Sequence, residues 1–352
     1  MRTSGCWYVA ALLLLGCSFE SLSASDPAVS DDETATSSET DAVDGHDSSS
    51  SSATQTDSAT SGPDTDPPAP STSGPSETDA DPSDDTTGGT DAELGCPDPL
   101  PDAWILCEDF EDIDDPSSHF AWWAGAGIAL EGPGRESPTA FEVTHFPGES
   151  WSGVAEMRFG SGPAANNVAQ PDALFDEIWV RFHTRVDDGW PVEGPGDLVE
   201  LEGIDGAGAM AFISRASATQ DAPQVWSGAY SCVGYDQVYC DGVEDWVDLT
   251  WLGGQRGQAA VFAAPTAQEW TCVVMHARLN TPGASDGMME VRVNGVPDSQ
   301  VSNLNYRGVL DELGFNRIGL PTFMEVPLQQ THQRFIDDVV VSEERLDCDD
   351  FI

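Results

Sequence analysis

Lysine is absent from this chain of 352 residues, so its 13 basic side chains are all arginines, set against 62 acidic ones. The formal net charge is −49 at pH 7. So large a charge of one sign repels nucleic acids and anionic membrane surfaces. We therefore expect no nucleic-acid partner and no diffuse polyanion-binding surface.

The sequence also lacks the motifs of common cofactor and metal sites. No Cys-x-x-Cys pair occurs, and the histidines do not cluster beside cysteines, which argues against a zinc site. There is no Gly-rich phosphate loop, Ser–His–Asp motif or dinucleotide fingerprint. No segment has a sustained helical period. We therefore expect no required cofactor and no helical domain.

No long hydrophobic run is present either, because the apolar run Trp7–Leu15 is too short to span a bilayer. It leads into Leu14-Leu15-Gly16-Cys17, which resembles a bacterial lipobox. We interpret 1–16 as a lipoprotein signal peptide and Cys17 as the lipidated residue that anchors the protein to a membrane.

A simple secretory signal, cleaved near Ser23-Ala24-Ser25, is the alternative to lipidation. Ser18 follows the predicted lipidated cysteine, which by resemblance to known sorting patterns favours the outer membrane. We expect the protein to be exported and to face the periplasm or the cell surface.

Six cysteines remain once Cys6 is removed with the signal peptide and Cys17 carries lipid. An even number in an exported protein predicts disulfides. Six cysteines allow 15 connectivities, so we predict only the local pair Cys232–Cys240, which closes a short loop. The other four are Cys96, Cys107, Cys272 and Cys348.

The composition divides the chain near residue 95. Residues 17–95 are rich in Ser, Thr, Asp and Pro and hold almost no large apolar side chains, so we predict a disordered, acidic linker. A flexible chain of that length reaches about 50 Å, and charge repulsion extends it further. Residues 96–352 have the aromatic and branched aliphatic content of one folded domain.

The domain alternates short strand-like runs with turn residues. Phe175–Val186 is the clearest strand, because Ile178, Val180 and Phe182 alternate with polar residues and so share one face. Asn294-Gly295 after an alternating run is a hairpin signal. Many strands without intervening helices predict an all-β domain, a two-sheet antiparallel sandwich or jelly roll.

Three segments resemble the concanavalin A-like jelly roll of polysaccharide-lyase-like proteins. They are Trp270–Val296, with its NTPG turn and NG hairpin, the Asn305-Tyr306-Arg307-Gly308 segment, and Phe335–Leu346 with IDDVVVS. The resemblance implies two curved antiparallel sheets whose concave face often holds a polysaccharide. It does not imply an activity, because one fold hosts many functions.

The polar faces of the long strands concentrate the scarce arginines. If these strands are neighbours, the side chains form a basic groove that contains a tryptophan and is suited to a polysaccharide. The predicted groove consists of Trp179, Arg181, His183, Arg185, His276, Arg278, Glu290 and Arg292.

Polyuronate lyase chemistry requires a cation on the substrate carboxylate, a base for the C5 proton and an acid for the leaving oxygen. Arg181 or Arg278 supplies the cation, and His183 or His276 the base. Tyr230 or Tyr306 supplies the acid. The alternative is that these are solvated strand residues paired with neighbouring acids.

Hydrolase chemistry requires two carboxyl groups, about 5–5.5 Å apart for retention. Glu200 and Glu202 share one face of the run Leu198–Asp205 and are the candidates, but such spacings arise by chance in so acidic a chain. As an enzyme, the chain fits a lyase better than a hydrolase.

The jelly-roll resemblance also implies a structural Ca²⁺ where the first strand meets the last, with Asp109 and Asp338 as ligands. We expect a monomer whose domain binds a polysaccharide. A polysaccharide lyase and a non-catalytic structural or protein-interaction module are the alternatives.

Overall fold

The computed structural model describes one compact unit within Ser83–Ile352. The predicted signal peptide 1–16, Cys17 and all but the last residue of the predicted linker 17–95 lie outside the described residues. Within the described ranges, no helix has the length and apolar character needed to cross a bilayer. The described residues are 95–111, 116, 119–191, 196–219, 222–242, 248–263, 268–324 and 327–349.

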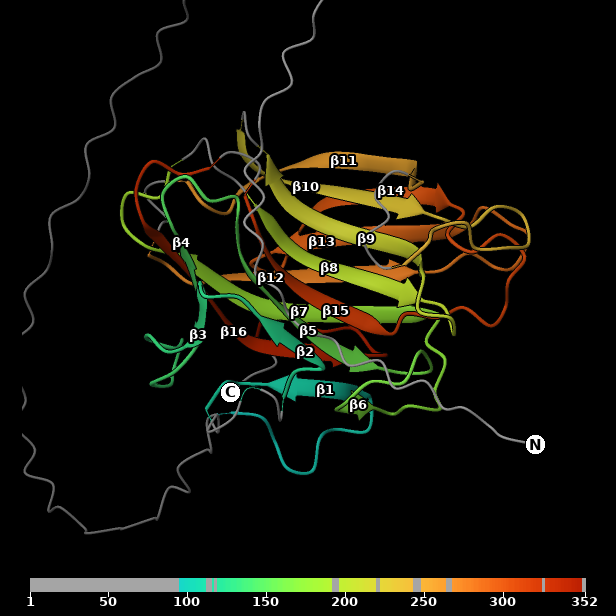
Figure 1. Ribbon diagram of the computed structural model, residues 1–352, viewed down its shortest axis with the longest axis horizontal. Coiled ribbons are helices and arrows are strands. Elements are labelled where there is room, and N and C mark those ends of the chain that lie inside the picture. The colour runs from blue at the N-terminus through green and yellow to red at the C-terminus, as the bar shows by residue number, and fades with distance from the viewer. Residues whose placement is uncertain are drawn as a thin grey trace, which may run out of the picture. The chain divides into compact units, whose positions relative to one another are not determined.

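Two antiparallel sheets of eight strands each, sheet A and sheet B, make up this unit (Figure 1). In sheet A, β1 (Trp104–Glu108) pairs with β16 beside the main path. The main path of sheet A is β14 (Val296–Leu304), β13 (Gly287–Val293), β12 (Thr271–Arg278), β7 (Glu177–Val186), β16 (His332–Ser342), β4 (Phe141–His145) and β3 (Ile128–Leu130).

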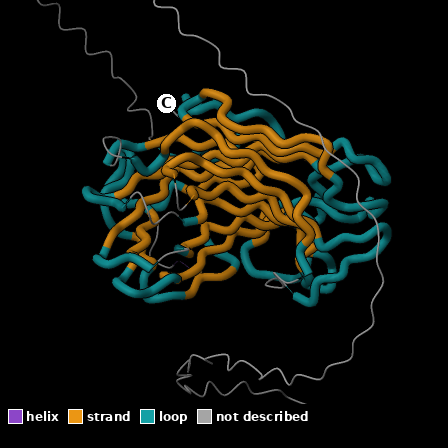
Figure 2. Tube along the Cα trace, turned by 90° about the horizontal axis from the view of Figure 1, so that it is seen from above, coloured by secondary structure: helices purple, strands orange, loops and turns teal. Residues whose placement is uncertain are grey.

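Sheet B has the same size, and its edge strand β6 (Val168–Ala169) pairs in parallel with β5. Figure 2 shows the strands filling the middle of the domain and the loops gathering at its two ends. The order in sheet B is β11 (Thr250–Ala260), β10 (Ala222–Ser231), β9 (Met210–Thr219), β8 (Asp197–Ile204), β15 (Arg317–Phe323), β5 (Trp151–Phe159) and β2 (Trp122–Ala124).

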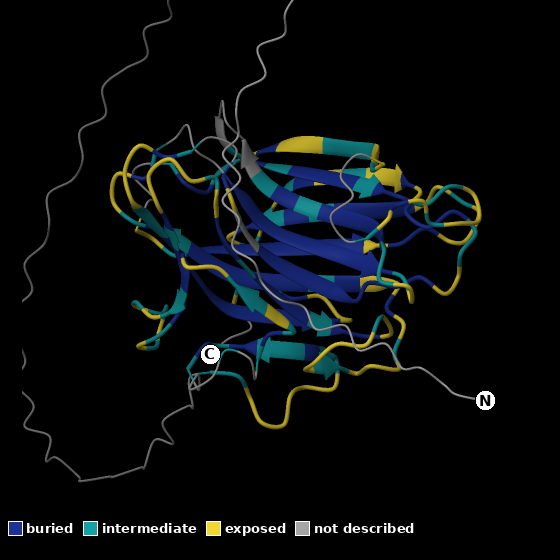
Figure 3. Cartoon of the chain, in the orientation of Figure 1, coloured by how far each residue is buried: buried dark blue, intermediate teal, exposed yellow. Residues whose placement is uncertain are grey.

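The predicted two-sheet jelly roll is therefore confirmed, and β7 lies in its centre. Ile178, Val180 and Phe182 of β7 are fully buried in the core between the sheets. Each such side chain contributes about 1.5–3 kcal/mol by leaving water. Figure 3 shows the same distribution, with buried residues along the strands and exposed ones in the loops.

The Asn294-Gly295 hairpin is also present. Both residues have positive φ, 49° and 78°, as a two-residue type I′ turn requires. The turn places Val293 opposite Val296 and so aligns β13 with β14.

Three disulfides join the six cysteines, and the predicted pair Cys232–Cys240 is confirmed. Cys96–Cys107 binds the start of the domain to β1. Cys272–Cys348 binds the last described segment to β12. The two ends of the described chain are thus both fixed to sheet A.

Removing Cys272–Cys348 should lower stability more than removing Cys232–Cys240. The first bond closes a separation of 76 residues and the second one of 8, and loop-closure entropy grows with the loop. Replacing both cysteines of a pair by serine should lower the free energy of unfolding by about 4.5 kcal/mol for Cys272–Cys348 and by about 2.5 kcal/mol for Cys232–Cys240, measured by urea denaturation. Equal losses from the two pairs would contradict this assignment.

Candidate functional site

The residues predicted to form the basic groove lie on the outer face of sheet A. Cys272 stands opposite His183, and His276 stands opposite Trp179, because β12 and β7 are neighbours. Arg181 and Arg278 belong to the same face by alternation. The structure thus brings the β7 and β12 candidates together on one surface.

The chain ends cover part of that surface. Arg181 is fully buried, and its Nη1 donates a hydrogen bond to the carbonyl oxygen of Asp347 at 3.2 Å. Its guanidinium also lies 5.9 Å from the ring centre of Trp104 in β1. The disulfide Cys272–Cys348 holds the C-terminal segment in this position. A polymer has no open path to Arg181.

His183 is closed off in a similar way. Its Nδ1 lies 3.2 Å from Asp338 Oδ2, and the same oxygen pairs with Arg135. Burial lowers the pKa of His183 although Asp338 opposes that effect. Burial alone would raise the pKa of Asp338, but hydrogen bonds from His183 and Arg135 hold it below its ordinary value. Arg135 and His183 thus offset the negative charge of Asp338 within a buried cluster.

The calcium prediction stays a prediction. Asp109 Oδ2 accepts the N–H of Cys96 at 2.6 Å, and Asp338 is engaged by Arg135 and His183. Among the described residues, no group of three or more His, Cys, Asp or Glu side chains has an arrangement able to hold a metal ion.

The remaining sheet A candidates pair with their neighbours. Trp179 stacks on His276 with ring centres 3.8 Å apart, and His276 Nε2 lies 2.7 Å from Glu177 Oε1. Arg292 Nη1 binds Glu290 at 2.8 Å. These are the contacts expected of strand residues paired with nearby acids.

Two arginines near the ends of the same strands contact aromatic rings or a backbone carbonyl group. The guanidinium of Arg185 lies 5.1 Å from the ring centre of Trp270 and 4.8 Å from that of Phe335. Arg278 is exposed and donates to the carbonyl oxygen of Asp286.

The structure corrects the prediction that Tyr306 acts beside these histidines. Tyr306 is fully buried between the sheets, where its hydroxyl lies 2.7 Å from Ser214 Oγ and its ring packs on Phe212. Burial raises its pKa far above the ordinary value. The alternative acid, Tyr230, alternates with the core residue Ala229 and so lies on the outer face of sheet B. Neither tyrosine shares a surface with His183.

A second polar surface occupies the outer face of sheet B. Directly opposed residues form a line across seven strands, which we name the Glu200 row. With strands about 4.8 Å apart, the row is about 29 Å long. Its members, from β11 to β2, are Gly254, Gly228, Arg215, Glu200, Gly319, Glu156 and Trp122.

Ion pairs connect the charges on this surface. Arg317 of β15 binds Glu202 Oε2 at 2.6 Å through Nη1 and Glu156 through Nη2. Arg158 reaches the other oxygen of Glu156 at 3.3 Å. Sequence analysis did not select these partners, although Glu156 and Arg158 alternate with core residues along β5.

Glu200 differs from the other carboxyl groups of this surface. It is buried, and no described residue donates a hydrogen bond to its carboxyl group. Burial, with the charges of Asp197 and Glu202, raises its pKa to about 8, against the opposing effect of Arg215 and Arg317. Burial also raises the pKa of Glu202, which Arg317 opposes. Burial therefore favours the protonated form of Glu200.

Gly319 leaves space beside these acids. A Cβ atom at this position would lie 3.5 Å from Glu200 Oε2 and 3.9 Å from Glu202 Oε1. Carboxyl oxygens of both residues therefore lie close to the same point beside the Gly319 backbone, which is itself buried.

Aromatic side chains stand at both ends of the row. Trp226 and Trp251 stack with ring centres 6.0 Å apart, and Tyr230 packs edge-on against Trp251. Trp251 lies over Gly228, where an added Cβ would contact its ring at 2.9 Å. Trp122 is 45% exposed at the opposite end.

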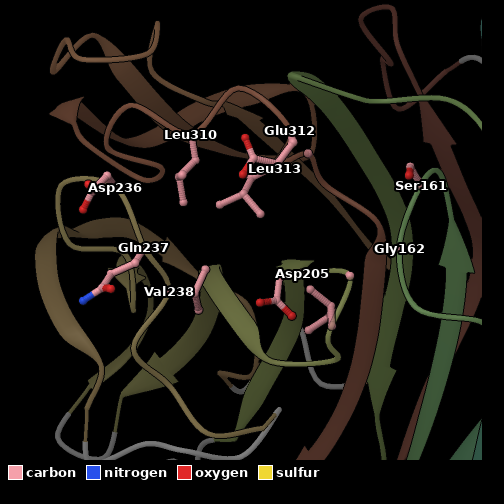
Figure 4. Close-up of a pocket in the computed structure, with 12 residues that line it drawn as sticks. Ser161, Gly162, Asp205, Asp236, Gln237, Val238, Leu310, Glu312 and Leu313 are labelled. Atoms are coloured by element: carbon pink, nitrogen blue, oxygen red, sulfur yellow. The ribbon is translucent and has the colours of Figure 1, made fainter.

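A cavity of about 460 Å³ opens beyond the C-terminal end of β8 (Figure 4). Asp205 lies in one wall, Asp236 in another, and Leu313 in a third. Asp205 ends the run that holds Glu200 and Glu202. Its Oδ1 accepts the N–H groups of Ala207 and Ala209 in its own turn.

Comparisons with known proteins give likenesses of structure alone. No family model matches the chain, and no curated protein matches its sequence. The described strands form a two-sheet antiparallel jelly-roll sandwich. When sequence identity is low, a structural similarity indicates a similar fold, and the chemistry has to be argued from the residues of the site.

Two lyases and a toxin domain are among the similar solved structures. The endo-β-1,4-glucuronan lyase of the fungus Trichoderma reesei is 12% identical, covering 68% of this chain and 95% of its own, with a TM-score of 0.47. The PL-14 alginate lyase of Aplysia kurodai is 13% identical, covering 68% and 98%, with a TM-score of 0.48. A botulinum neurotoxin serotype D/C binding domain is 12% identical, covering 70% and 50%, with a TM-score of 0.42.

Glu200 should make stability depend on pH between about 4.5 and 8. The ordinary pKa of a glutamate is 4.5, and that of Glu200 in the folded protein is about 8. The folded state therefore binds this proton more tightly than the unfolded state does. The resulting contribution to stability is present at low pH and is lost as the pH rises through this window. Wild-type protein should lose on the order of 3 kcal/mol more unfolding free energy than Glu200→Gln between pH 5 and pH 8.

Urea denaturation at the two pH values measures this difference. Asp337, whose pKa burial raises to about 7, titrates in both proteins and cancels in the comparison. Parallel pH profiles for the two proteins would show that Glu200 ionises normally.

Proposed function

We propose that the domain binds a polysaccharide along the Glu200 row on the outer face of sheet B. The observation that carries the proposal is the arrangement of hydrogen-bonding charges around Glu200 between aromatic surfaces at Trp251 and Trp122. Sugars present hydroxyl groups around the ring edge and C–H groups on the ring face. The first require polar partners and the second stack on aromatic rings.

The charge of the row favours an uncharged glycan. Arg317 and Arg158 are already paired with Glu202 and Glu156, and Arg215 Nε binds Asp197 Oδ1 at 2.6 Å. Among the described residues of this surface, no excess of positive charge remains to attract uronate carboxylates. Neutral polysaccharides therefore fit this surface better than polyuronates.

The lyase alternative has less support from the geometry. Arg181 is covered by the C-terminal segment, His183 is paired with Asp338, and Tyr306 lies in the core. The three roles that β-elimination requires are thus not gathered on one open surface.

Trp251→Ala should weaken glycan binding at least about tenfold, equal to about 1.4 kcal/mol, because it removes an exposed ring at one end of the row. Trp179→Ala is the matched control on the outer face of sheet A. Binding is measured on a glycan array and then by calorimetry with the best ligand.

The two substitutions together show which outer face binds the glycan. Loss in Trp251→Ala with unchanged binding in Trp179→Ala supports the Glu200 row. The reverse result would return the site to sheet A. If wild-type protein binds no glycan in a broad panel, the polysaccharide function is rejected and a structural or protein-interaction module gains support.

We also propose that lipid on Cys17 anchors the protein to the outer membrane. The support is the sequence Leu14-Leu15-Gly16-Cys17 after a short apolar run. Metabolic labelling with a fatty acid should mark the wild-type protein, and Cys17→Ser should abolish both the label and membrane fractionation. Labelling that survives this substitution would refute the assignment.

A further inference from the structure

We propose that the cavity beyond the C-terminal end of β8 binds a small organic cation, an ammonium group carried on an apolar chain. The cavity shares no lining residue with the Glu200 row, so the inference does not depend on the proposed glycan binding. Its volume of about 460 Å³ lies within the range of small-molecule sites in proteins.

The cavity is open to solvent and has apolar walls. Asp236 and Glu312 line it and are exposed, so a ligand can reach it from water. Leu310 and Leu313 approach its centre from one side and Val238 from the opposite side (Figure 4). Leu310 and Val238 pack against the core but are only partly buried. The apolar surface that they leave open would be covered by an apolar part of the ligand.

Carboxylates supply all the charge of this lining. Asp205, Asp236 and Glu312 come from three different loops, and the described lining residues include no basic side chain. Oδ1 of Asp205 accepts the N–H groups of Ala207 and Ala209, while its Oδ2 accepts no hydrogen bond from a described residue. A cation gains charge-assisted hydrogen bonds here and an anion is repelled. The charge of the lining thus selects an ammonium group.

The walls are held together by the protein itself. Asn316 Nδ2 donates to the carbonyl oxygens of Ser161 at 2.8 Å and Ile204 at 2.7 Å, and both acceptor residues line the cavity. On another side, the N–H of Val309 donates to the carbonyl oxygen of Tyr235 at 2.9 Å, which joins two of the lining loops. A site formed before the ligand arrives loses less entropy on binding.

The test titrates the full chain with n-hexylammonium by calorimetry at about 150 mM salt, where attraction to distant exposed acids is largely screened. One saturable site is expected. n-Butylammonium should bind more weakly, by about fourfold for each methylene group that it lacks. The uncharged 1-hexanol and the anionic hexanoate should bind at least about tenfold more weakly than n-hexylammonium.

Substitutions in the lining locate the binding. Asp205→Asn should weaken it at least about tenfold, because asparagine keeps an oxygen for the two N–H groups of the turn but carries no charge. Gly206→Arg should abolish it by placing a guanidinium at the cavity, where an added Cβ meets no atom within 4 Å. Asp311→Asn is the matched control, since Asp311 is exposed beside Glu312 but does not line the cavity, and should change binding less than about twofold.

The variants and the ligand series can each overturn the proposal. Equal losses from Asp205→Asn and Asp311→Asn would show diffuse attraction to an acidic surface. Binding of 1-hexanol as tight as that of n-hexylammonium would show that the carboxylates play no part. Absence of a saturable site in wild-type protein also overturns the proposal. Urea denaturation checks that each variant is folded, and if Asp205→Asn is not, binding retained by Gly206→Arg is the contradicting result.

Discussion

The double ion pair of Arg317 is the interaction on which the outer face of sheet B depends. It joins Glu202 on β8 to Glu156 on β5 across the strand that separates them. Both acids are nearly inaccessible, and uncompensated buried charges of like sign would cost several kcal/mol each. With Arg317 of β15 in place, β8 and β5 carry acids on either side of it, and Glu200 is the carboxyl group of the described cluster that has no ion pair of this kind.

The two outer faces of the sandwich differ in their side chains and in how far they are covered. Part of the outer face of sheet A is covered by Trp104 of β1 and by the segment around Cys348, and many of its polar residues pair with one another. The face of sheet B combines glycines, paired charges and exposed rings. Under the proposed function, the ligand-binding surface and the partly covered polar surface lie on opposite sides of one core.

Sequence periodicity predicted what depends on neighbours along the chain. The alternation in β7, the Asn294-Gly295 turn and the Cys232–Cys240 loop are local patterns, and all three are present. The site depends on residues far apart in sequence. Arg317 and Glu156 are separated by 161 positions, and nothing in either segment specifies that β15 and β5 will be neighbours.

The dependence on residues far apart in sequence also explains why the structure buries Arg181 and Tyr306 where the sequence analysis did not. Alternation placed Arg181 correctly on a polar face, but it carries no information about a chain end that later crosses that face. Tyr306 lies outside the described strands, so no alternation fixed its direction. Its hydroxyl is satisfied in the core by Ser214, a contact that only the paired sheets create.

The disulfides at the chain ends also determine how the domain bears mechanical load. Tension applied to the chain before Cys96 passes through a covalent bond into β1, and tension at Cys348 passes into β12. Both strands belong to sheet A, where pairing with β16 and β7 resists shear. The strands of sheet B take no part in these pairings, so tension applied at the two disulfides acts first on sheet A.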